Sequence, residues 1–317
     1  MHTLVTGGAG FIGSTLVDRL LAEGHSVDVV DDLSTGSLAN LAEARANPAY
    51  ELTFHRFDVR SEGFVELMAH RRPEVVFHLA AQADVRVSVV RPVFDAEVNI
   101  IGTVNVAEGA RAAGTRKVVF AASGGTLYGE PKKLPVRETA AQRPLSPYGV
   151  SKKAAIDYLV AYRELHGVEH TALALGNVYG PRQDPHGEAG VVAIFAGLLL
   201  GGQPCTIFGG GRQTRDFVYV DDAVDAFARA ATKGDGLLVN VGTGTETSVN
   251  TLYATMAELA GVDSRAEHAD ARPGELARSA LDPGRAAVQL GWRPWTTLDV
   301  GTGAVLRWFR SRSGPPC

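Results

Sequence analysis

A glycine-rich turn near the start of the chain, TGGAGFIGS, constrains the fold more than any other stretch. It follows an apolar run that predicts a strand over 2–7, and it opens a stretch at 13–24 that predicts a helix. Gly7, Gly10 and Gly13 are three residues apart. Glycines at such positions let the backbone turn tightly and approach a pyrophosphate at a helix N-terminus. Strand, glycine turn and helix in this order predict a dinucleotide-binding unit.

Two acidic residues after the second expected strand indicate which dinucleotide is bound. The strand at 26–32 ends in Asp31 and Asp32, close to the offset of about 20 residues that such units show. A carboxylate there accepts hydrogen bonds from the adenosine ribose and repels a 2′-phosphate, which predicts NAD rather than NADP. The alternative is a structural turn followed by a helix-capping aspartate. A P-loop is excluded because the glycines are not followed by GK[ST].

Short apolar stretches alternate with helical stretches along the first half of the chain. Further strands are expected at 74–81 and 116–123, a strand and turn at 169–180, and helices at 63–73, 99–114 and 147–167. Apolar strands interleaved with helices predict an α/β fold. Its centre is a Rossmann-type, doubly wound parallel sheet that helices cover on both faces.

The second half is less regular and predicts a smaller C-terminal α/β lobe. Helices are expected near 220–232, 248–261 and 299–312, and a strand at 237–242. We expect residues 1–170 to form the NAD-binding domain and residues 171–317 to form mainly the lobe. Segments near 171–180 and 213–242 are expected to return to the first domain.

Composition excludes several classes of protein. The net charge of the 317 residues is −4, so no basic field attracts nucleic acid or an anionic membrane. The longest apolar run, at 191–200, is far shorter than the roughly 20 residues of a membrane span. The first residues lack the pattern of a signal peptide, and Cys205 and Cys317 do not indicate a disulfide framework or a zinc site. We therefore expect a soluble, cytoplasmic protein without a metal.

The stretch SPYGVSKK, at the start of the longest expected helix, carries a candidate catalytic pair. Ser146 suits the N-cap and Pro147 the first helical position, which places Tyr148 and Lys152 one turn apart on one face. A phenol has a pKa of about 10 and is a poor base at neutral pH. A neighbouring ammonium ion stabilises the phenolate, so Tyr148 is a candidate general base. Taken alone, the pair could equally be an exposed Tyr and Lys at ordinary helical spacing.

The chain resembles the extended short-chain dehydrogenases/reductases. The similarity is to UDP-glucose 4-epimerase-like members of the NAD-dependent epimerase/dehydratase family, and it covers essentially the whole chain. The matching segments are TGGAGFIGS, DDLSTG, FDVR, VFHLAAQADVRVSV, VNIIGTVNV, SPYGVSK, NVYGPRQDPHG, FGGGRQTRDFVYVDD and RPGE.

The resemblance implies which residues hold NAD. They comprise the glycine turn, the acidic residues with the loop after them, a pair beside the adenine, and residues that line the cofactor after the strand at 74–81. In chain order these are Gly7, Gly10, Phe11, Ile12, Gly13, Asp31, Asp32, Ser34, Thr35, Gly36, Asp58, Val59, Leu79, Ala80, Ala81 and Asn99. Tyr148 is implied as the base and Lys152 as the anchor of the nicotinamide ribose.

The resemblance also implies a UDP-sugar site in the second half of the chain, which makes the smaller C-terminal lobe the substrate-binding lobe. The residues at the matching positions are Asn177, Phe208, Arg215, Arg272, Glu275 and Ser279. Arg215 and Arg272 match the pair that grips the pyrophosphate, a task that suits the guanidinium group. Ser279 lies where some epimerases carry a large Tyr, which predicts room for an N-acetyl group. The run Ala-Leu-Gly at 174–176 departs from the Arg-Tyr or Arg-Phe that the family often has there.

The implied activity is that of an isomerase that inverts C4 of a UDP-hexose, UDP-galactose or UDP-glucose, through a 4-keto sugar. A UDP-N-acetylhexosamine or a UDP-glucuronate is the alternative substrate. The family's 4,6-dehydratases carry Asp-Glu where this chain has Gly125 and Thr126, which argues against dehydration. A non-catalytic NAD-binding protein predicts loss of Tyr148 or Lys152, and both are present. The family commonly forms homodimers through two helices, here those near 99–114 and 147–167.

Many relatives carry an assisting Ser or Thr four residues before the tyrosine that corresponds to Tyr128, where this chain has Gly124. The two nearest hydroxyl residues are Ser123 and Thr126. Strict strand alternation places Gly124 and Thr126 on one face, which favours Thr126. A Gly-Gly pair can also bend the strand end and redirect Ser123. We expect Ser123 to hydrogen-bond the sugar O4, with Thr126 as the alternative.

Overall fold

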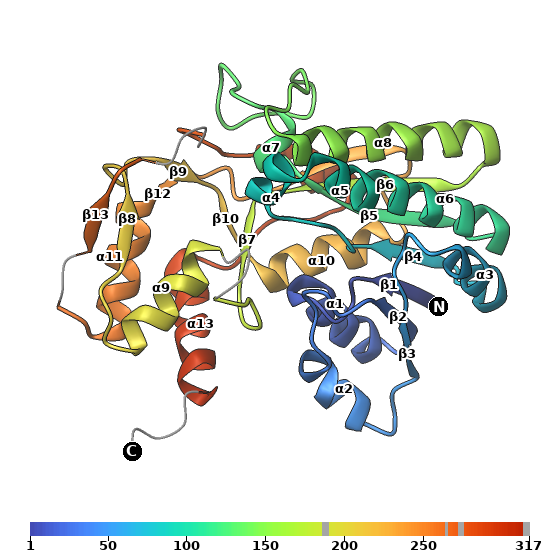
Figure 1. Ribbon diagram of the computed structural model, residues 1–317, viewed down its shortest axis with the longest axis horizontal. Coiled ribbons are helices and arrows are strands. Elements are labelled where there is room, and N and C mark those ends of the chain that lie inside the picture. Colours follow the sequence, from blue (N-terminus) through green and yellow to red (C-terminus); the bar gives the residue numbers. More distant parts are fainter. Residues whose placement is uncertain (186–189, 264–265, 272–275, 313–317) are drawn as a thin grey trace.

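Seven parallel strands form the central sheet of the protein, which a computed structural model describes over residues 1–185, 190–263, 266–271 and 276–312 (Figure 1). Their order is β11-β6-β5-β4-β1-β2-β3. The bounds are β1 His2–Thr6, β2 Ser26–Asp31, β3 Leu52–Arg56, β4 Val75–His78, β5 Lys117–Ser123, β6 Glu169–Leu175 and β11 Leu237–Val241. The predicted Rossmann-type parallel sheet is confirmed. The strand order reverses between β1 and β4, and the crevice at such a switch point is where these sheets bind ligands.

Alternate residues of the strands feed two separate hydrophobic cores. In β5, Val119 belongs to one core, whereas Val118 and Phe120 belong to the other. This alternation follows from the period of two of an extended strand. Both faces of the sheet are therefore apolar and each needs a layer of helices.

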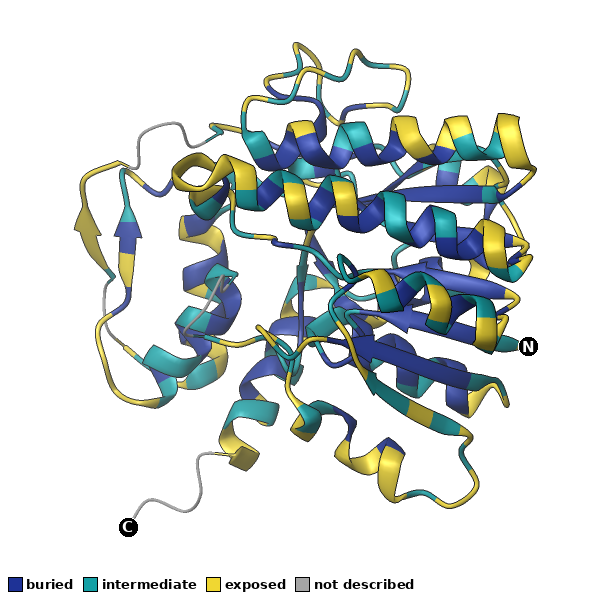
Figure 2. Ribbon diagram, turned by 45° about the vertical axis from the view of Figure 1, so that its right-hand side comes forward, coloured by how far each residue is buried: buried dark blue, intermediate teal, exposed yellow. Residues whose placement is uncertain are grey.

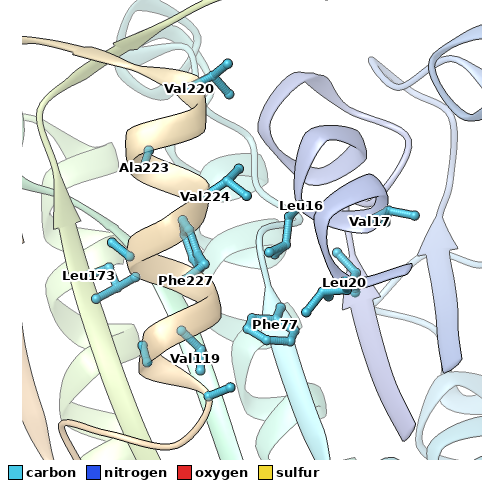
Figure 3. Packing of buried hydrophobic residues seen from close by; sticks show 14 of the residues in the cluster. Leu16, Val17, Leu20, Phe77, Val119, Leu173, Val220, Ala223, Val224 and Phe227 are labelled. Carbon is cyan, nitrogen blue, oxygen red and sulfur yellow. The ribbon is translucent and has the colours of Figure 1, made fainter. Parts of the chain in front are cut away.

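Helices α1 (Phe11–Ala22) and α10 (Val220–Ala230) cover one face of the sheet. Figure 3 shows Leu20 of α1 and Phe227 of α10 beside Phe77 of β4. The other face is covered by α3 (Glu62–Arg71), α6 (Gly102–Ala113) and α8 (Pro147–His166). The two layers hold the carboxyl ends of the strands in fixed positions, and those ends build the site.

Helix α8 has the ends that its sequence predicts. The Ser146 side chain accepts a 3.2 Å hydrogen bond from the Gly149 N–H, and Pro147 occupies the first helical position. Gly167 ends the helix with φ of 69°, a left-handed conformation that glycine adopts without strain. These caps fix the place of the first turn of α8, which carries Tyr148.

A smaller lobe packs around a third core made by three helices, α9 (Val191–Leu200), α11 (Val249–Ala260) and α13 (Leu298–Arg312). It also contains the parallel pair β8 (Thr206–Phe208) and β13 (Glu267–Ala269), seen with α11 at the left of Figure 1. The apolar run noted at 191–200 is α9, which buries Phe195 and Leu199 in this core. None of the helices in the described ranges has the length and apolar character to cross a membrane.

Two short pairings join the lobe to the sheet. β7 (Asn177–Tyr179) pairs in parallel with β10 (Phe217–Tyr219), and β9 (Thr214–Arg215) pairs in antiparallel fashion with β12 (Thr247–Ser248). The chain then returns to the main sheet through α10 and β11. The division into domains at residue 170 stays a prediction.

The structure differs from the expected secondary structure in several places. The strand and turn expected at 169–180 are two strands, because β6 ends at Leu175 and β7, after it, belongs to another sheet. Gly176 lies at the break, where a Cβ would come 2.8 Å from the Asp216 carbonyl oxygen. Strand β3 was missed because it is a short, half-exposed edge strand without the long apolar run of a buried one. The extended backbone assumed beyond Ser123 is a helical turn.

The remaining helical segments are short and connect the larger elements. They are η1 (Leu38–Leu41), α2 (Ala42–Ala46), α4 (Val85–Val90), α5 (Pro92–Ala96), the π-helical η2 (Glu97–Ile101), α7 (Gly124–Leu127) and α12 (Gly284–Gln289). α5, η2 and α6 follow one another without a break, so the helix expected at 99–114 begins earlier, at Pro92.

Candidate active site

The glycine turn between β1 and α1 is shaped so that no side chain fits into it. A Cβ at Gly7, where φ is +69°, would lie 2.7 Å from the Ala80 backbone nitrogen, and one at Gly13 would lie 2.1 Å from the Gly7 oxygen. Helix α1 then begins at Phe11, with Gly10 as N-cap, no capping side chain and no acidic residue in its first turn. The N–H groups of a first helical turn have no partner within the helix. The turn therefore offers a close, positively polarised backbone cradle to a phosphate group.

Asp31, the last residue of β2, is buried against this turn. Its carboxylate accepts hydrogen bonds from the N–H groups of Ala9 (2.9 Å) and Leu33 (2.8 Å). Burial raises the pKa of Asp31, and the two backbone bonds oppose that rise. The carboxylate thus braces the glycine turn against the loop that follows β2.

Asp32 and the next residues lie on the outer side of the same loop. Asp32 is exposed and accepts hydrogen bonds from the Ser34 N–H (2.9 Å) and hydroxyl (2.6 Å). Ser34 and Thr35 are also exposed. Gly36 faces Asp31 so closely that a Cβ there would lie 2.7 Å from Oδ1. The carboxyl end of β2 therefore carries one buried carboxylate, that of Asp31, and one exposed carboxylate, that of Asp32.

The predicted adenine pair follows β3. Asp58 forms a bidentate pair with Arg60, in which Nη2 lies 2.5 Å from Oδ2, and these hydrogen bonds lower the pKa of the Asp58 carboxyl. Val59 is buried and packs against Gly102, where a Cβ would approach its side chain to 2.9 Å. The glycine lets α6 lie directly against this loop.

The residues after β4 lie directly against the glycine turn. The Ala80 N–H donates to the Thr6 hydroxyl (3.2 Å), and the segment 79–81 runs on to Gln82. The buried Asn99 side chain accepts from the Gln82 N–H (3.1 Å) and donates to its carbonyl (2.9 Å). Asn99 therefore fixes the backbone behind 79–81.

His78, just before this segment, has a structural role. Its ring lies between the hydroxyls of Thr6 (2.8 Å) and Thr103 (3.1 Å). Burial and the nearby Lys152 lower its pKa to about 3, so it is neutral. A neutral histidine with both ring nitrogens bonded fits the packing of the sheet better than acid–base chemistry.

Tyr148 and Lys152 lie together on α8, as their spacing predicts. Both are buried, and Lys152 is only 2% exposed. Lys152 Nζ lies 4.8 Å from the centre of the Phe120 ring and 5.8 Å from the centre of the Tyr148 ring. Burial lowers the pKa of Lys152 to about 8, and the charge of Asp95 acts in the opposite direction. The lysine can thus place a positive charge beside the phenol.

The stretch between Ser123 and Tyr128 differs from the expected extended strand. Ser123 ends β5 and is the N-cap of α7, so Ser123 and Thr126 lie one helical turn apart. The Thr126 hydroxyl makes a long 3.5 Å contact with the Ser123 carbonyl. The Ser123 hydroxyl makes no hydrogen bond with any residue that the structure describes. A Cβ at Gly124 would meet the Leu281 side chain at 2.4 Å, so a hydroxyl at that position would point into the core.

The substrate-side residues occupy the edges of the lobe. Asn177 is exposed at the start of β7, Phe208 ends β8, and Ser279 is buried at 8% exposure. Arg215 on β9 donates from Nη1 to the carbonyls of Thr214 and Leu276, both at 2.8 Å. Arg272 and Glu275 lie outside the described residues.

Two buried carboxylates near the site were missed by the sequence analysis. Asp216 accepts hydrogen bonds from the Thr243 N–H (2.8 Å) and hydroxyl (2.6 Å) and from the Leu281 N–H (2.9 Å). It thereby ties the segment beside Ser279 to the sheet. The sequence signal for Asp216 is a charged residue directly before the apolar strand β10. Asp95, the second, lies four residues before Asn99, a spacing that places two polar side chains on one helical face.

These residues fit NAD. The side-chain-free cradle suits a pyrophosphate, the acidic loop after β2 suits the ribose diol of an adenosine without a 2′-phosphate, and Tyr148 and Lys152 lie where strands end. The fold and the site define an NAD-binding α/β enzyme of the short-chain dehydrogenase/reductase class.

Comparison with known proteins identifies the family. Residues 4–304 match the family model described as GDP-mannose 4,6 dehydratase. The chain belongs to this family, one of NAD-dependent epimerases and dehydratases, which confirms the resemblance noted in the sequence.

Individual relatives are similar over their full length. The UDP-glucose 4-epimerase of Mycolicibacterium smegmatis is 50% identical, over 99% of this chain and 100% of that protein. The structure of UDP-glucose 4-epimerase from Thermotoga maritima with UDP-glucose has a TM-score of 0.93 and 43% identity, over 98% of this chain and 99% of that one. The Thermus thermophilus UDP-glucose 4-epimerase complex with NAD has a TM-score of 0.90 and 43% identity, over 98% and 100%.

Proposed function

We propose that the protein is an NAD-dependent isomerase that inverts C4 of a UDP-hexose, interconverting UDP-glucose and UDP-galactose through a 4-keto sugar. The observation that carries this proposal is the buried Tyr148–Lys152 pair. It lies at the carboxyl edge of a sheet whose glycine turn fits NAD, and the lobe beside it carries the residues expected for a UDP group. Bound NAD supplies the redox chemistry, since its nicotinamide ring accepts a hydride and can return it.

Tyr148 is the base of the proposed reaction. As a phenolate it takes the proton of the sugar 4-hydroxyl when C4 is oxidised, and it returns that proton when C4 is reduced on the other face. The Lys152 ammonium favours the phenolate because an opposite charge nearby stabilises an anion. Such a positioned base accelerates proton transfer by about 10²–10⁴-fold.

Ser123 is the proposed assisting hydroxyl. It ends β5 at the same edge of the sheet, and its oxygen has no hydrogen-bond partner among the described residues. The Thr126 hydroxyl, in contrast, faces the Ser123 carbonyl. A free hydroxyl can bond the sugar O4 and hold it toward Tyr148. Thr126 remains the alternative.

Inversion requires that the sugar turns over while the nucleotide stays bound. We assign the nucleotide end to Phe208 against uridine, to Arg215 with Arg272 on the pyrophosphate, and to Glu275 at the uridine ribose. Asn177 is assigned to the sugar. Guanidinium groups suit a diphosphate by charge and by geometry. Holding the UDP end while leaving the hexose loosely bound exposes each face of C4 in turn.

A second substrate class is a UDP-N-acetylhexosamine. The side chain of Ser279 is small and lies at the position where a large Tyr limits the pocket in some epimerases. UDP-glucuronate is a third candidate with the same chemistry. Dehydration is disfavoured because Gly125 and Thr126 supply no acid–base pair, and a non-catalytic role is disfavoured because Tyr148 and Lys152 are both present.

One assay tests the function. Purified protein is incubated without added NAD with UDP-galactose, UDP-N-acetylglucosamine or UDP-glucuronate, and the products are separated by chromatography. We expect UDP-glucose from UDP-galactose, and no product from a Tyr148→Phe variant that carries the same amount of NAD. A 4-keto-6-deoxy product would identify a dehydratase instead, and an NAD-loaded protein that converts none of the three would refute the assignment.

We further propose that the protein acts in the cytoplasm as a homodimer. Helix α8 exposes several apolar side chains, among them Val150 (51%), Tyr158 (44%) and Leu165 (74%), and Ile101 before α6 is 51% exposed. Figure 2 shows exposed positions on the outer sides of the helical layer that contains α6 and α8. Burying these side chains against a second copy removes apolar surface from water. Light scattering on a sizing column gives the mass, and cell fractionation gives the location.

A further inference from the structure

Asp95, the single acidic residue of α5, has a fully buried carboxylate surrounded by neutral donors. It accepts hydrogen bonds from the Ser151 hydroxyl at 2.6 Å, the Gln82 side-chain amide at 2.9 Å and the Asn99 side-chain amide at 3.0 Å. No salt bridge to Asp95 is present in the part of the chain that the structure describes. Burying a charge without a direct ion pair costs free energy. A buried carboxylate at this place therefore suggests a functional role for Asp95.

The three donors connect Asp95 to both sides of the proposed site. Ser151 directly precedes Lys152 on α8, whereas Gln82 directly follows the segment 79–81 that borders the NAD cradle. Asn99 closes the network through its two bonds to the Gln82 backbone. The carboxylate therefore joins the helix that carries the base to the end of strand β4.

Lys152 is the positively charged side chain on which the charge of Asp95 acts. The titratable groups that interact with Lys152 are Tyr148 on its own helix, Asp95 on α5 and the neutral His78 on β4, and its Nζ lies 4.8 Å from the centre of the Phe120 ring of β5. Burial lowers the pKa of Lys152 to about 8, while the negative charge of Asp95 raises it. Apart from the Tyr148 phenolate itself, Asp95 is the group named here that favours the charged lysine.

We propose that Asp95 is a positioning residue of the epimerase: through its hydrogen bond to Ser151 it fixes the turn of α8 that carries Lys152, and its buried negative charge favours the Lys152 ammonium ion beside Tyr148. This role rests on the proposed function, since the ammonium form matters where Tyr148 acts as the base. Asp95 itself does not touch the reacting atoms. It acts through Lys152, by charge, and through Ser151, by holding α8 in place.

The substitution Asp95→Asn separates charge from packing. The asparagine oxygen can still accept from the Gln82 and Asn99 amides, and its NH₂ group can donate to the Ser151 hydroxyl, so every polar atom keeps a partner. The variant therefore loses the negative charge while the hydrogen-bond network is satisfied. Asp222→Asn is the matched control, because Asp222 is another fully buried carboxylate, on α10 and on the opposite face of the sheet.

The test measures kcat against pH for UDP-galactose conversion in wild type and both variants, together with bound NAD and Tm. For Asp95→Asn we expect the alkaline limb, where Lys152 loses its charge, to move to lower pH by about one unit. A shift of that size lowers kcat about tenfold on the alkaline side. Asp222→Asn is expected to lower Tm and to keep the wild-type limb. An unchanged limb in Asp95→Asn, whatever its Tm, would overturn the proposal.

A second readout does not depend on turnover. NMR of the protein labelled at lysine Cε, with the Lys152 signal assigned from Lys152→Arg, follows the titration of Lys152 directly. We expect its midpoint to fall in Asp95→Asn, and an equal midpoint in both proteins would refute the role of the charge. A wild-type protein that converts no UDP-sugar would refute the proposed function only. The Lys152 titration would still show whether the charge of Asp95 acts on Lys152. If Asp95→Asn does not fold, Asp95→Ser, which leaves space for a water among the donors, carries the same expectation.

Discussion

The hydroxyl of Tyr128 donates a 2.7 Å hydrogen bond to Oδ1 of Asn240 on β11, and both side chains are buried. Asn240 in turn donates from its side chain to the Val136 carbonyl at 2.9 Å. Burial raises the pKa of Tyr128 above its ordinary value, which keeps the phenol protonated. Tyr128 thus anchors the turn after Ser123 to the edge of the sheet.

Two tyrosines near the site are therefore expected to behave in opposite ways when their hydroxyls are removed. Tyr148→Phe should lower kcat by at least about 100-fold, because the base is lost, while NAD content and Tm stay close to wild type. Tyr128→Phe should keep most of the activity and lose about 1–2 kcal/mol of unfolding free energy, because Asn240 Oδ1 is left without its donor. Steady-state kinetics and urea unfolding measure the two effects. Full activity in Tyr148→Phe would rule out Tyr148 as the base.

The contrast between Ser123 and Thr126 can be resolved in the same assay. Ser123→Ala should lower kcat by about 10–100-fold, because the sugar O4 loses a positioned hydrogen bond. Thr126→Ala should change kcat by less than about threefold, since its hydroxyl faces the Ser123 carbonyl. The NAD content of both variants is the control for folding. The reverse order of the two effects would transfer the assisting role to Thr126.

The sequence was enough to predict the parts of the site whose signals are local. The glycine turn, Asp31 and the Tyr148–Lys152 spacing each depend on neighbours in the chain, and the structure places all of them at one edge of the sheet. Strand β3 was missed because the apolar pattern that marks buried strands is weak at an exposed edge.

Contacts between distant segments left no such local signal. The helical turn after Ser123 could not be foreseen, because the space for it depends on Leu281, far along the chain. Asp216 was missed for the same reason, since its structural role depends on hydrogen bonds from the backbone of Thr243 and Leu281, which lie far along the chain. A buried polar residue of this kind hydrogen-bonds to segments that are distant in the sequence. Asp95 is a second example, since it accepts hydrogen bonds from Ser151 and Gln82.

The close contact between Gly13 and Gly7 makes a strong prediction for cofactor binding. In Gly13→Ala the new Cβ would lie 2.1 Å from the Gly7 carbonyl oxygen, so α1 must move away from the turn. We expect a loss of about 1–3 kcal/mol of unfolding free energy and at least about tenfold weaker retention of NAD. Retention is measured from the NAD released on denaturing the purified protein.

The control for this change is Gly210→Ala. Apart from Gly210 and its two chain neighbours, no atom of the described residues lies within 4 Å of a Cβ built at Gly210, and its backbone is not left-handed, so an alanine fits. Wild-type NAD content is expected there. Wild-type NAD content in Gly13→Ala would mean that the turn does not form the cradle.

Asp28 on β2 is the centre of a charge cluster away from the site, and it makes a prediction for stability. Its carboxylate, 1% exposed, accepts hydrogen bonds from Arg71 (2.7 and 2.8 Å), His2 (2.7 Å) and His55 (3.0 Å). Burial alone raises the pKa of Asp28, but the hydrogen bonds from these three side chains outweigh it, and the pKa is lowered.

Asp28→Asn should therefore lower the unfolding free energy at pH 7 by about 1–3 kcal/mol, because Arg71, His2 and His55 lose a buried charged acceptor while Arg71, 34% exposed, stays accessible to water. A lowered pKa in the folded state means that the stabilisation is present above the ordinary pKa of an aspartate and is lost as pH falls through the folded value. The difference between wild type and variant should accordingly shrink below about pH 4. Asp157→Asn, which removes an exposed i,i+4 pair with Lys153, should cost less than about 0.5 kcal/mol at any pH. Urea unfolding from pH 3 to pH 8 measures both variants, and a pH-independent difference for Asp28→Asn would show that packing, not charge, accounts for the effect.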